Sequence, residues 1–399
     1  MKILQLCPDY PPYVRGGGAQ TYKILADEWK KDGHEVEVIA SVPSALANKQ
    51  TAASDGGECD FFRLIGAPER LREASYFMPM HPGEMLRLRR TLKVKAAASD
   101  RIVIHGIMET MPLLSLFLLR RYSDRILLVD HAVSTAEHTT LLNLSSRIMY
   151  RTIGKLAVGS KGNILVFGDR SRLEFINYFG RQHAPSISVV PLGIDAVGFA
   201  DCYSRAMERE SRLSKWLSSY VRQNCPFILS IGRNVRTKGF DVLIRSFSET
   251  VKRYPDAALL IAGDAAAHTN ELKQLAEELH LTDRIHFMGR VTEEEKVFLM
   301  VKCALLAIPS LKEGYGLNAV EADILGVPVV ATRTGAHEQI LHGSMSCLFV
   351  QPGNESELTR SLNEMLSRPR LPSEFRKDEA ARFDMRELSR KYLDTFSGR

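Results

Sequence analysis

Short apolar runs alternate with helical stretches along the whole chain, and this alternation limits the fold more than any other feature of the sequence. Continuous apolar runs of about four to eight residues are typical of parallel strands that are buried on both faces. The helical stretch Ala19–Asp32 separates the first two runs, Lys2–Cys7 and Glu35–Ala40. Strand and helix in alternation predict an α/β protein with parallel, doubly wound sheets.

The apolar runs fall into two series, which predicts two domains because 399 residues are long for a single core. We expect a boundary near Asp195, a first domain over residues 1–195 and a second over residues 196–375. Ligands of such sheets bind beyond the carboxyl ends of the strands, so a cleft between two facing domains is the default site. The later runs of the first series are Arg101–His105, Ile126–Asp130, Asn163–Phe167 and Ser188–Val190, and the second series comprises Phe227–Ile231, Ala258–Ala262, Arg284–Phe287, Ala304–Ile308, Pro328–Ala331 and Ser346–Phe349.

The composition suits a cytoplasmic protein. No apolar run approaches the eighteen or so residues of a membrane-spanning helix, and the N-terminal apolar stretch is too short for a signal peptide. The six cysteines are scattered without a CxxC pair, which favours reduced thiols over a disulfide framework or a zinc site. A net charge of +6 suits phosphate-rich ligands or an anionic membrane surface and identifies neither.

The stretch "PPYVRGGGAQTY" follows the first strand and opens the first helix. Gly16, Gly17 and Gly18 would let backbone amides approach a ligand closely, and the helix N-terminus favours a phosphate group. The spacing is not GxGxxG, which argues against a dinucleotide. The alternative is a tight strand-to-helix turn without a ligand.

The stretch "SIGRNVRTKGFDVLI" places Arg233 and Lys238 just past the first strand of the second series. A guanidinium and an ammonium group at a strand end supply the charge that a phosphate needs. The alternative is a solvated basic loop, but the strand-end position and Gly239 favour an anion site.

The stretch "SLKEGYGLNAVEADILGVPVVAT" contains Glu313 and Glu321 with seven residues between them. On one continuous helix the two side chains would point about 80° apart. If Glu313 lies in a loop and Glu321 lies one or two turns into the helix, both can face a cleft. A carboxylate accepts two hydrogen bonds from a diol, and a sugar nucleotide offers vicinal hydroxyls on its ribose and its sugar. The alternative is that Glu321 pairs with a neighbouring cation.

These stretches together resemble the retaining glycosyltransferases of family four, which have the twin-Rossmann (GT-B) fold. Gly-Arg, four residues, Lys-Gly, followed by Glu, seven residues, Glu, is a specific pattern. The region "TGAHEQI" departs from the family, which often has a second glycine where this chain has Ala336. The matching pieces, in the family's order, are "PPYVRGGGAQ", "GHEVEVIA", "VVPLGID", "GRNVRTKG" and "EGYGLNAVEADILGVPVVAT".

The resemblance implies a role for each matching residue. Arg233 and Lys238 correspond to the pair that binds the donor diphosphate, and the glycine loop to the amides that meet the β-phosphate. Glu313 corresponds to the glutamate that contacts the transferred sugar, and Glu321 to the one that holds the ribose diol. The donor-binding positions implied in this way are Gly16, Gly17, Arg233, Lys238, Glu313, Gly314, Gly316, Leu317 and Glu321.

A histidine also follows a strand where the family has an active-site histidine. His131 in "LLVDHAVS" corresponds to it, but His105 in "RIVIHGIMET" also ends a strand and competes for the role. A lone histidine is often a structural residue. The implied catalytic residues are therefore Arg233, Lys238, Glu313 and His131.

The resemblance implies transfer of a hexosyl unit from a nucleoside diphosphate-sugar to an acceptor hydroxyl, with retention of the anomeric configuration. Fixed cations would stabilise the leaving phosphate, so neither a metal nor another cofactor is expected. The acceptor would be a glycan, a lipid-linked or a small-molecule hydroxyl in glycan, glycolipid or cell-envelope polysaccharide synthesis, and no nucleic acid is expected. A sugar-nucleotide epimerase and a non-catalytic nucleotide-sugar-binding protein share the fold and are the alternatives.

Two further expectations concern the C-terminal residues of the chain and one basic stretch of the first domain. The family's last helix crosses back to that domain, which predicts the same for residues 376–399. The stretch "GEMLRLRRTLKVKA", Gly83 to Ala96, mixes apolar and basic residues as helices on anionic membrane surfaces do. It predicts contact with the inner face of the cell membrane, unless it is a packed helix with a solvated basic face.

Overall fold

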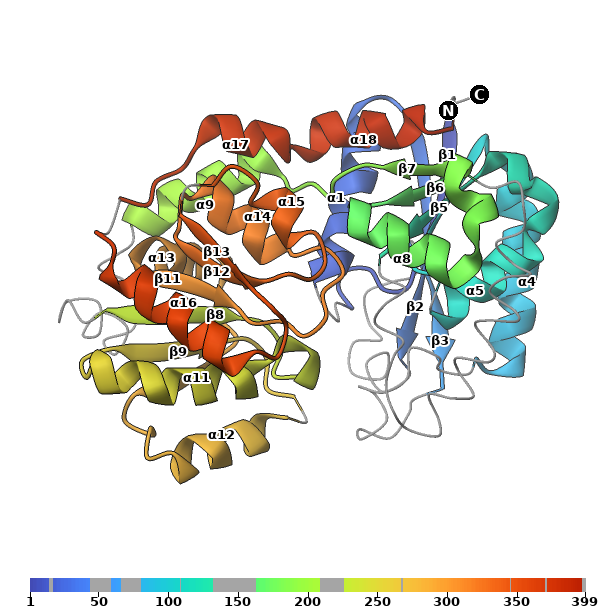
Figure 1. Cartoon of the computed structure of the whole chain (residues 1–399). Coiled ribbons are helices and arrows are strands. Elements are labelled where there is room, and N and C mark those ends of the chain that lie inside the picture. Colours follow the sequence, from blue (N-terminus) through green and yellow to red (C-terminus); the bar gives the residue numbers. More distant parts are fainter. Residues whose placement is uncertain are drawn as a thin grey trace. The chain divides into compact units, whose positions relative to one another are not determined.

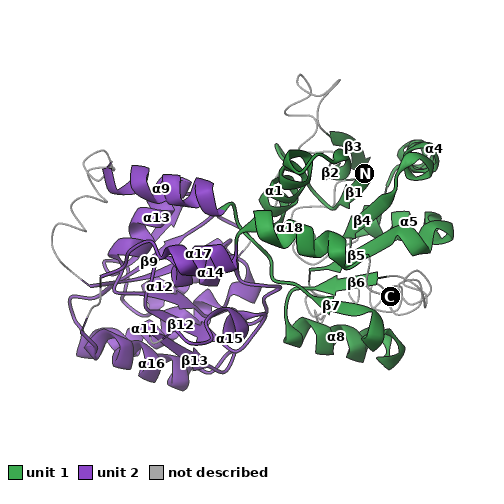
Figure 2. Cartoon of the chain, turned by 90° about the horizontal axis from the view of Figure 1, so that it is seen from above, with its two compact units in different colours: residues 1–195, 384–399 green, residues 196–383 purple. Residues whose placement is uncertain are grey.

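The computed structural model describes residues 1–13, 17–43, 59–65, 80–107, 109–131, 163–208, 226–266, 268–344, 346–369 and 372–396. Its contacts divide the chain into two compact units, Met1–Asp195 with Asp384–Arg399, and Ala196–Phe383 (Figure 2). The C-terminal return to unit 1 starts at Asp384 and not at residue 376, because helix α17 (Lys377–Arg382) packs on α14 (Leu317–Ile324) of unit 2.

Unit 1 is built on a seven-stranded parallel sheet with the order β3-β2-β1-β4-β5-β6-β7 (Figure 1). The three central strands, β1, β4 and β5, are followed by candidate site residues. The strands are β1 (Lys2–Cys7), β2 (Glu35–Pro43), β3 (Cys59–Leu64), β4 (Arg101–His105), β5 (Ile126–Asp130), β6 (Asn163–Val166) and β7 (Ile187–Val189), and the helices are α1 (Gly17–Lys31), α4 (Pro82–Ala98), α5 (Thr110–Leu118), α8 (Asp169–Phe179) and α18 (Met385–Asp394), with 3-10 turns at Arg120–Arg125 and Arg181–Ser186.

Helices cover both faces of this sheet, as a doubly wound fold requires. Leu4 and Leu6 of β1 belong to one core cluster with Leu88 of α4. The neighbouring position Cys7 lies on the opposite face, in a second cluster with Tyr22 of α1. Side chains of a strand alternate between faces, so a continuous apolar run fills both cores at once.

Unit 2 repeats this architecture with a six-stranded parallel sheet in the order β10-β9-β8-β11-β12-β13. Helices α11, α12 and α16 share one apolar core with the sheet, to which Phe240 and Phe247 contribute buried rings. The strands are β8 (Phe227–Ile231), β9 (Ala258–Ala262), β10 (Ile285–Gly289), β11 (Leu305–Ile308), β12 (Val329–Thr332) and β13 (Cys347–Val350), and the helices besides α14 and α17 are α9 (Ala196–Glu208), α11 (Phe240–Arg253), α12 (Thr269–Glu278), α13 (Glu293–Lys302), α15 (His337–Ile340) and α16 (Glu355–Ser367), with a 3-10 turn at Arg236–Lys238.

The two parallel sheets confirm the predicted fold class, and one strand had no counterpart in the sequence prediction. Strand β3 pairs with β2 at the edge of the first sheet. Its sequence, CDFFRL, has an acidic and a basic residue among the apolar ones because Asp60 and Arg63 lie where an edge strand meets solvent. It therefore does not read as a continuous apolar run.

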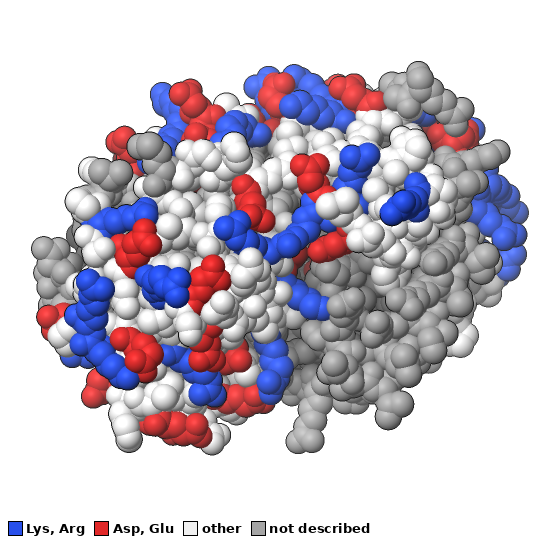
Figure 3. Space-filling view, viewed as in Figure 1, with Lys and Arg blue, Asp and Glu red and all other residues white. Residues whose placement is uncertain are grey.

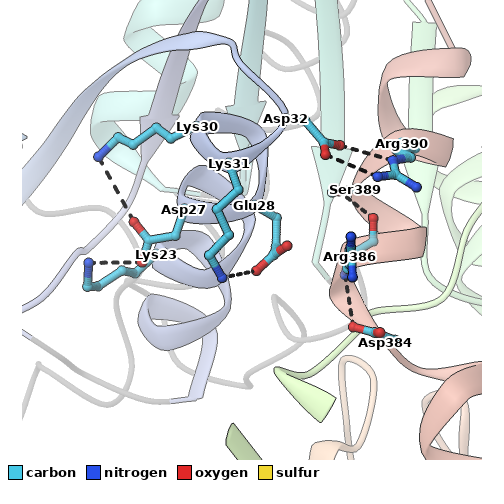
Figure 4. A network of polar contacts seen from close by, with 10 residues as sticks. All are labelled: Lys23, Asp27, Glu28, Lys30, Lys31, Asp32, Asp384, Arg386, Ser389 and Arg390. Atoms are coloured by element: carbon cyan, nitrogen blue, oxygen red, sulfur yellow. Dashed lines mark hydrogen bonds and ion pairs between the residues drawn. The ribbon is translucent and has the colours of Figure 1, made fainter. Parts of the chain in front are cut away.

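The last helix of the chain completes unit 1. Helix α18 lies beside α1, where Trp29 Nε1 donates a hydrogen bond to the Ser389 carbonyl oxygen at 3.0 Å. Arg390 reaches Asp32 with two hydrogen bonds, of 3.0 and 3.1 Å (Figure 4). These contacts join parts of the chain that are more than 350 residues apart. Among the described residues, no helix combines the length and the apolar character that crossing a membrane requires.

Candidate active site

The turn after β8 presents the two predicted cations of unit 2. The Arg233 side chain is exposed and has no hydrogen bond or ion pair to another described residue, while Lys238 ends the 3-10 turn and is partly buried. Two glycines border this turn. A Cβ at Gly232 would lie 3.3 Å from Cδ of the flexible Lys238 side chain, whereas Gly239 has a φ of +66° and the Pro309 carbonyl oxygen lies 2.2 Å from where its Cβ would be. The turn therefore depends on Gly239.

Glu313 lies in the loop between β11 and α14 and is bound to Lys238. Lys238 Nζ donates to Glu313 Oε2 at 2.6 Å, and the Ser310 hydroxyl donates to the same oxygen at 3.1 Å. Burial acts to raise the pKa of Glu313, but the charges of Lys238 and His337 and the hydrogen bonds together outweigh it, so the pKa lies below the ordinary value. Glu313 is thus a partly buried carboxylate held in its charged form.

A histidine that the sequence prediction did not include closes this loop. His337 begins α15, is fully buried and lies 2.9 Å through Nδ1 from the Thr332 carbonyl oxygen. Gly316 faces it with a φ of +113°, and a Cβ there would lie 2.6 Å from Cδ2 of the His337 ring. The only signal in the sequence was the glycine, because the histidine that requires it is 21 residues later.

The predicted donor-binding residues Gly314 and Leu317 flank this contact. Gly314 lies in the loop, and Leu317 is the first residue of α14. Asn318 follows and donates from Nδ2 to the Ile231 carbonyl oxygen at 2.8 Å. This bond fastens the start of α14 to the end of β8, next to the turn that carries Arg233.

Glu321 lies in the second turn of α14, and the structure shows the ion pair that the sequence left open as an alternative. Lys296 of α13 donates to Glu321 Oε1 at 2.8 Å and also lies 2.5 Å from Glu293 Oε2. Burial lowers the pKa of Lys296, but the two glutamates outweigh it and the pKa lies above its ordinary value. Glu321 Oε2 is buried without a partner among the described residues, so one carboxylate oxygen remains available.

In unit 1, helix α1 begins at Gly17, so this residue lies at a helix N-terminus as predicted for the glycine loop. Gly16 lies outside the described residues. A Cβ at Gly18 would lie 3.1 Å from the hydroxyl of Tyr22, one turn further along the helix. Tyr22 therefore connects the glycine loop to the residues at the ends of β4 and β5.

His105 and His131, which the sequence offered as rivals, lie side by side. His105 is the last residue of β4, His131 follows β5, and His105 Nδ1 lies 3.1 Å from His131 Nε2. The Tyr22 ring contacts both imidazoles, with centroid distances of 4.6 and 5.1 Å. Burial lowers the pKa of His131 to about 3 and, with the charge of His131, lowers that of His105 well below its ordinary value. Both rings are neutral at physiological pH.

The chemistry of these two sets of residues differs. The set in unit 2 offers cations and carboxylates at the carboxyl ends of β8 and β11, which suits a phosphate and the hydroxyls of a sugar. The set in unit 1 offers neutral rings and a helix N-terminus. Within the described ranges, no three His, Cys, Asp or Glu residues gather in a way that could hold a metal ion. Independence of a metal stays a prediction.

Comparison with known proteins connects unit 2 to a family. Residues 218–382 match the model of the glycosyl transferases group 1. Over these residues the chain is similar to the group 1 glycosyltransferases. The predicted resemblance to family four is thereby confirmed.

Curated proteins similar to this chain agree with that match. A D-inositol 3-phosphate glycosyltransferase of Corynebacterium jeikeium is 34% identical over 45% of this chain and 43% of its own length. A GDP-mannose-dependent alpha-(1-6)-phosphatidylinositol monomannoside mannosyltransferase of Mycolicibacterium smegmatis is 26% identical over 92% of this chain and 90% of its own. The chain spans about half the length of three Corynebacterium relatives, namely 43%, 59% and 48%.

Solved structures agree on the fold. Anabaena Alr3699/HepE in complex with UDP and glucose superimposes with a TM-score of 0.69 at 20% identity, covering 100% of this chain and 99% of that one. WaaG, a glycosyltransferase involved in lipopolysaccharide biosynthesis, gives a TM-score of 0.63 at 18% identity, covering 98% and 95%. At these identities the likeness establishes the GT-B fold alone.

Helix α4 corresponds to the predicted amphipathic stretch. Its apolar residues Leu88, Leu92 and Ala96 are buried, so the helix packs on the core as the alternative interpretation held. Leu86 and Val94 are nevertheless exposed. Figure 3 shows basic side chains gathered at the edge where α4 lies, and the exposed cations of this helix that have no ion pair to a described residue are Arg89, Arg90 and Lys93.

Proposed function

We propose that this protein transfers a sugar from a nucleoside diphosphate-sugar to an acceptor hydroxyl with retention of configuration. The observation that carries the proposal is the turn after β8. It holds Arg233 exposed without a counter-ion among the described residues, and Lys238 beside it is bound to the carboxylate of Glu313. A cation kept at a strand end by a turn that requires Gly239 suits a phosphate better than a solvated surface position does.

The proposed reaction develops negative charge on the leaving diphosphate. Arg233 has a planar group for two phosphate oxygens, and Lys238 keeps two ammonium hydrogens after donating to Glu313. Fixed donors of this kind stabilise the transition state without reorganising. Glu313, charged and partly buried, accepts hydrogen bonds from hydroxyls of the transferred sugar, and Glu321 Oε2 accepts one from the donor ribose.

In this proposal the acceptor is a hydroxyl of a glycan, a lipid-linked sugar or a small molecule. The names of two relatives support this class, because one is called an inositol phosphate glycosyltransferase and the other a phosphatidylinositol mannoside mannosyltransferase. The epimerase and binding-protein alternatives predict different products. An epimerase converts the donor alone into an isomer, and a binding protein converts nothing.

The first experiment measures nucleotide binding and donor turnover with a panel of UDP- and GDP-sugars. Arg233→Ala should weaken the binding of the matching nucleoside diphosphate at least tenfold, because a charge-assisted hydrogen bond contributes about 1.5–3 kcal/mol. Arg253→Ala is the matched control, since Arg253 is an arginine at the opposite end of α11, about 20 Å from its start. Equal binding by native protein and the Arg233 variant would contradict the proposal. Proton NMR of the sugar first released from the donor tests retention.

A further inference from the structure

Three polar side chains form a hydrogen-bonded row across neighbouring strands of unit 1. Gln5 Nε2 lies 3.1 Å from His105 Nε2, and His105 Nδ1 lies 3.1 Å from His131 Nε2. The three residues come from β1, β4 and the end of β5, which are adjacent in the sheet. Gln5 and His105 are almost completely buried, so each of these contacts must match a donor with an acceptor.

The orientation of the Gln5 amide sets the direction of the row. Its Nε2 also lies 3.2 Å from the carbonyl oxygen of Tyr22, which can only accept a hydrogen bond. The atom facing Tyr22 is therefore the amide nitrogen, which donates to Tyr22 and to His105. His105 Nε2 must accept, so it carries no hydrogen.

The positions of the ring hydrogens of His105 and His131 follow from the orientation of the Gln5 amide. Burial keeps His105 neutral, because it lowers the pKa of that imidazole well below the ordinary value. A neutral imidazole without a hydrogen on Nε2 has one on Nδ1, and His105 Nδ1 donates to His131 Nε2. His131 is neutral as well, with its pKa lowered to about 3 by burial, so its own hydrogen is on Nδ1.

We propose that Gln5 and His105 are positioning residues that hold His131 in the Nδ1–H tautomer, so that it donates a hydrogen bond to a substrate oxygen and does not act as a base. This inference rests on the proposed function for its substrate and on the hydrogen-bonded row for its chemistry. His131 Nε2 is already occupied, and Nδ1 has no partner among the described residues. The oxygen that it faces belongs to a sugar or acceptor hydroxyl, whose lone pair receives the hydrogen bond.

Aromatic rings fix the orientation of His131 as well as its tautomer. The edge of the Tyr22 ring meets the His131 ring at a centroid distance of 5.1 Å, and Phe167 contacts it at 4.7 Å. The imidazole cannot flip without losing both contacts and the hydrogen bond from His105. A side chain held in this way loses little freedom when it binds a ligand.

The test uses the full chain labelled with ¹⁵N in its histidines. Nitrogen–proton correlation spectra distinguish the two neutral tautomers and the charged ring, and the His131 signals are assigned by their loss in His131→Asn. We expect His131 of the native protein to be the neutral Nδ1–H tautomer at pH 7. Finding the Nε2–H tautomer or a charged ring would overturn the inference, whether or not the protein transfers a sugar.

Two variants of nearly equal size test the role in turnover. His105→Asn places an amide nitrogen where Nδ1 was, so it still donates to His131 Nε2. His105→Asp places only acceptor oxygens there, which forces His131 to carry a hydrogen on Nε2. We expect the Asn variant to keep kcat within about threefold of native and the Asp variant to lose more than tenfold, with the tautomer signals changing only in the latter.

Gln5→Leu is a second, independent probe. It removes the donor to His105 and should give a mixture of tautomers at His131 with an intermediate kcat. Thermal unfolding of every variant shows which variants are folded. If a variant is unfolded, the spectrum of the native protein still decides the tautomer of His131. Equal kcat in the Asn and Asp variants, together with a reversed tautomer in the Asp variant, would refute the positioning role while leaving the proposed glycosyl transfer intact.

Discussion

The two halves of the molecule, unit 1 and unit 2, use the same kind of sheet for opposite electrostatics. In unit 1 the carboxyl ends of β4 and β5 carry His105 and His131, which burial keeps uncharged. In unit 2 the residues beyond β8 and β11 include Lys238 and Glu313, and the lysine helps to hold the carboxylate in its charged form. Burial is common to both halves. A partner of opposite charge decides whether a buried group stays ionised, so the topology supplies positions and the loops supply the chemistry.

The largest effect should come from the charged half. Lys238→Met removes the ammonium group but keeps most of the stem that packs on Gly232. We expect kcat/KM for the donor to fall by about 100- to 1,000-fold, because losing a donor to the developing charge costs about 3–4 kcal/mol. Steady-state kinetics measure this, with Lys252→Met on the exposed face of α11 as the control. Near-native kinetics of the Lys238 variant would break the contrast between the halves.

Variants of Glu321 and Lys296 test whether Glu321 binds the donor or serves only the ion pair, because the two roles predict different effects of the variants. Glu321→Gln should raise the donor KM at least tenfold with little change in kcat, because the ribose is remote from the reacting bond and a charge-assisted hydrogen bond contributes about 1.5–3 kcal/mol. A donor that lacks the ribose 2′-hydroxyl should affect the native enzyme more than the variant. Lys296→Met should lower the thermal stability of unit 2 instead. Identical phenotypes of the two variants would mean that Glu321 serves only the ion pair.

Unit 1, which contains the neutral histidines, should lose folding stability at acidic pH. The pKa of His131 is about 3 when folded and about 6.5 when unfolded, so the unfolded chain binds more protons between these values. Stability therefore falls as the pH drops from about 6.5 towards 3, by about 2 kcal/mol between pH 7 and pH 5 for this residue alone. Hydrogen exchange of the β4 and β5 amides at both pH values measures the loss in unit 1. His131→Asn should reduce the pH dependence and leave the part that comes from His105, and a slope equal to the native one would contradict the prediction.

The smallest expected effect is on membrane binding by the exposed cations of helix α4 in unit 1. Replacing Arg89, Arg90 and Lys93 of α4 by glutamine should weaken binding to anionic vesicles by about 1 kcal/mol for each charge that contacts the surface. Co-sedimentation with anionic and neutral vesicles measures it. The control variant changes three cations of α11, Arg245, Lys252 and Arg253, and has the same net charge. If native protein binds neither kind of vesicle, the predicted membrane contact is wrong.

Much of the fold could be predicted because its strands are continuous apolar runs. The run Phe227–Ile231 matches β8 residue for residue, since a strand buried on both faces is mostly apolar, and its one polar residue, Ser230, donates a hydrogen bond to the Ala307 carbonyl oxygen. Strand β3 could not be found in this way, because an edge strand tolerates charges such as Asp60 and Arg63. Strand β3 can be recognised only from its backbone pairing with β2, which is seen once the sheet is formed.

The candidate site divides in the same way. Motif residues such as Lys238 and Glu313 could be named from their spacing, but their 2.6 Å contact depends on two loops that only the fold brings together. His105 and His131 are 26 residues apart, and only the order of strands β4 and β5 makes them neighbours. Lys296 was missed because it lies in no recognisable motif, and His337 was missed, although it lies in "TGAHEQI", because nothing in that stretch shows its contact with Gly316.

The clasp between α1 and α18 has a consequence for synthesis of the chain. Ser389 and Arg390 follow Trp29 and Asp32 by more than 350 residues, so they leave the ribosome long after them. Unit 2, Ala196–Phe383, is encoded as one uninterrupted segment between them. Unit 1 begins before unit 2 and is completed after it. A ribosome that stalls between Phe383 and Ser389 therefore releases a protein whose unit 2 has been made and whose unit 1 leaves the Trp29 indole without its carbonyl partner.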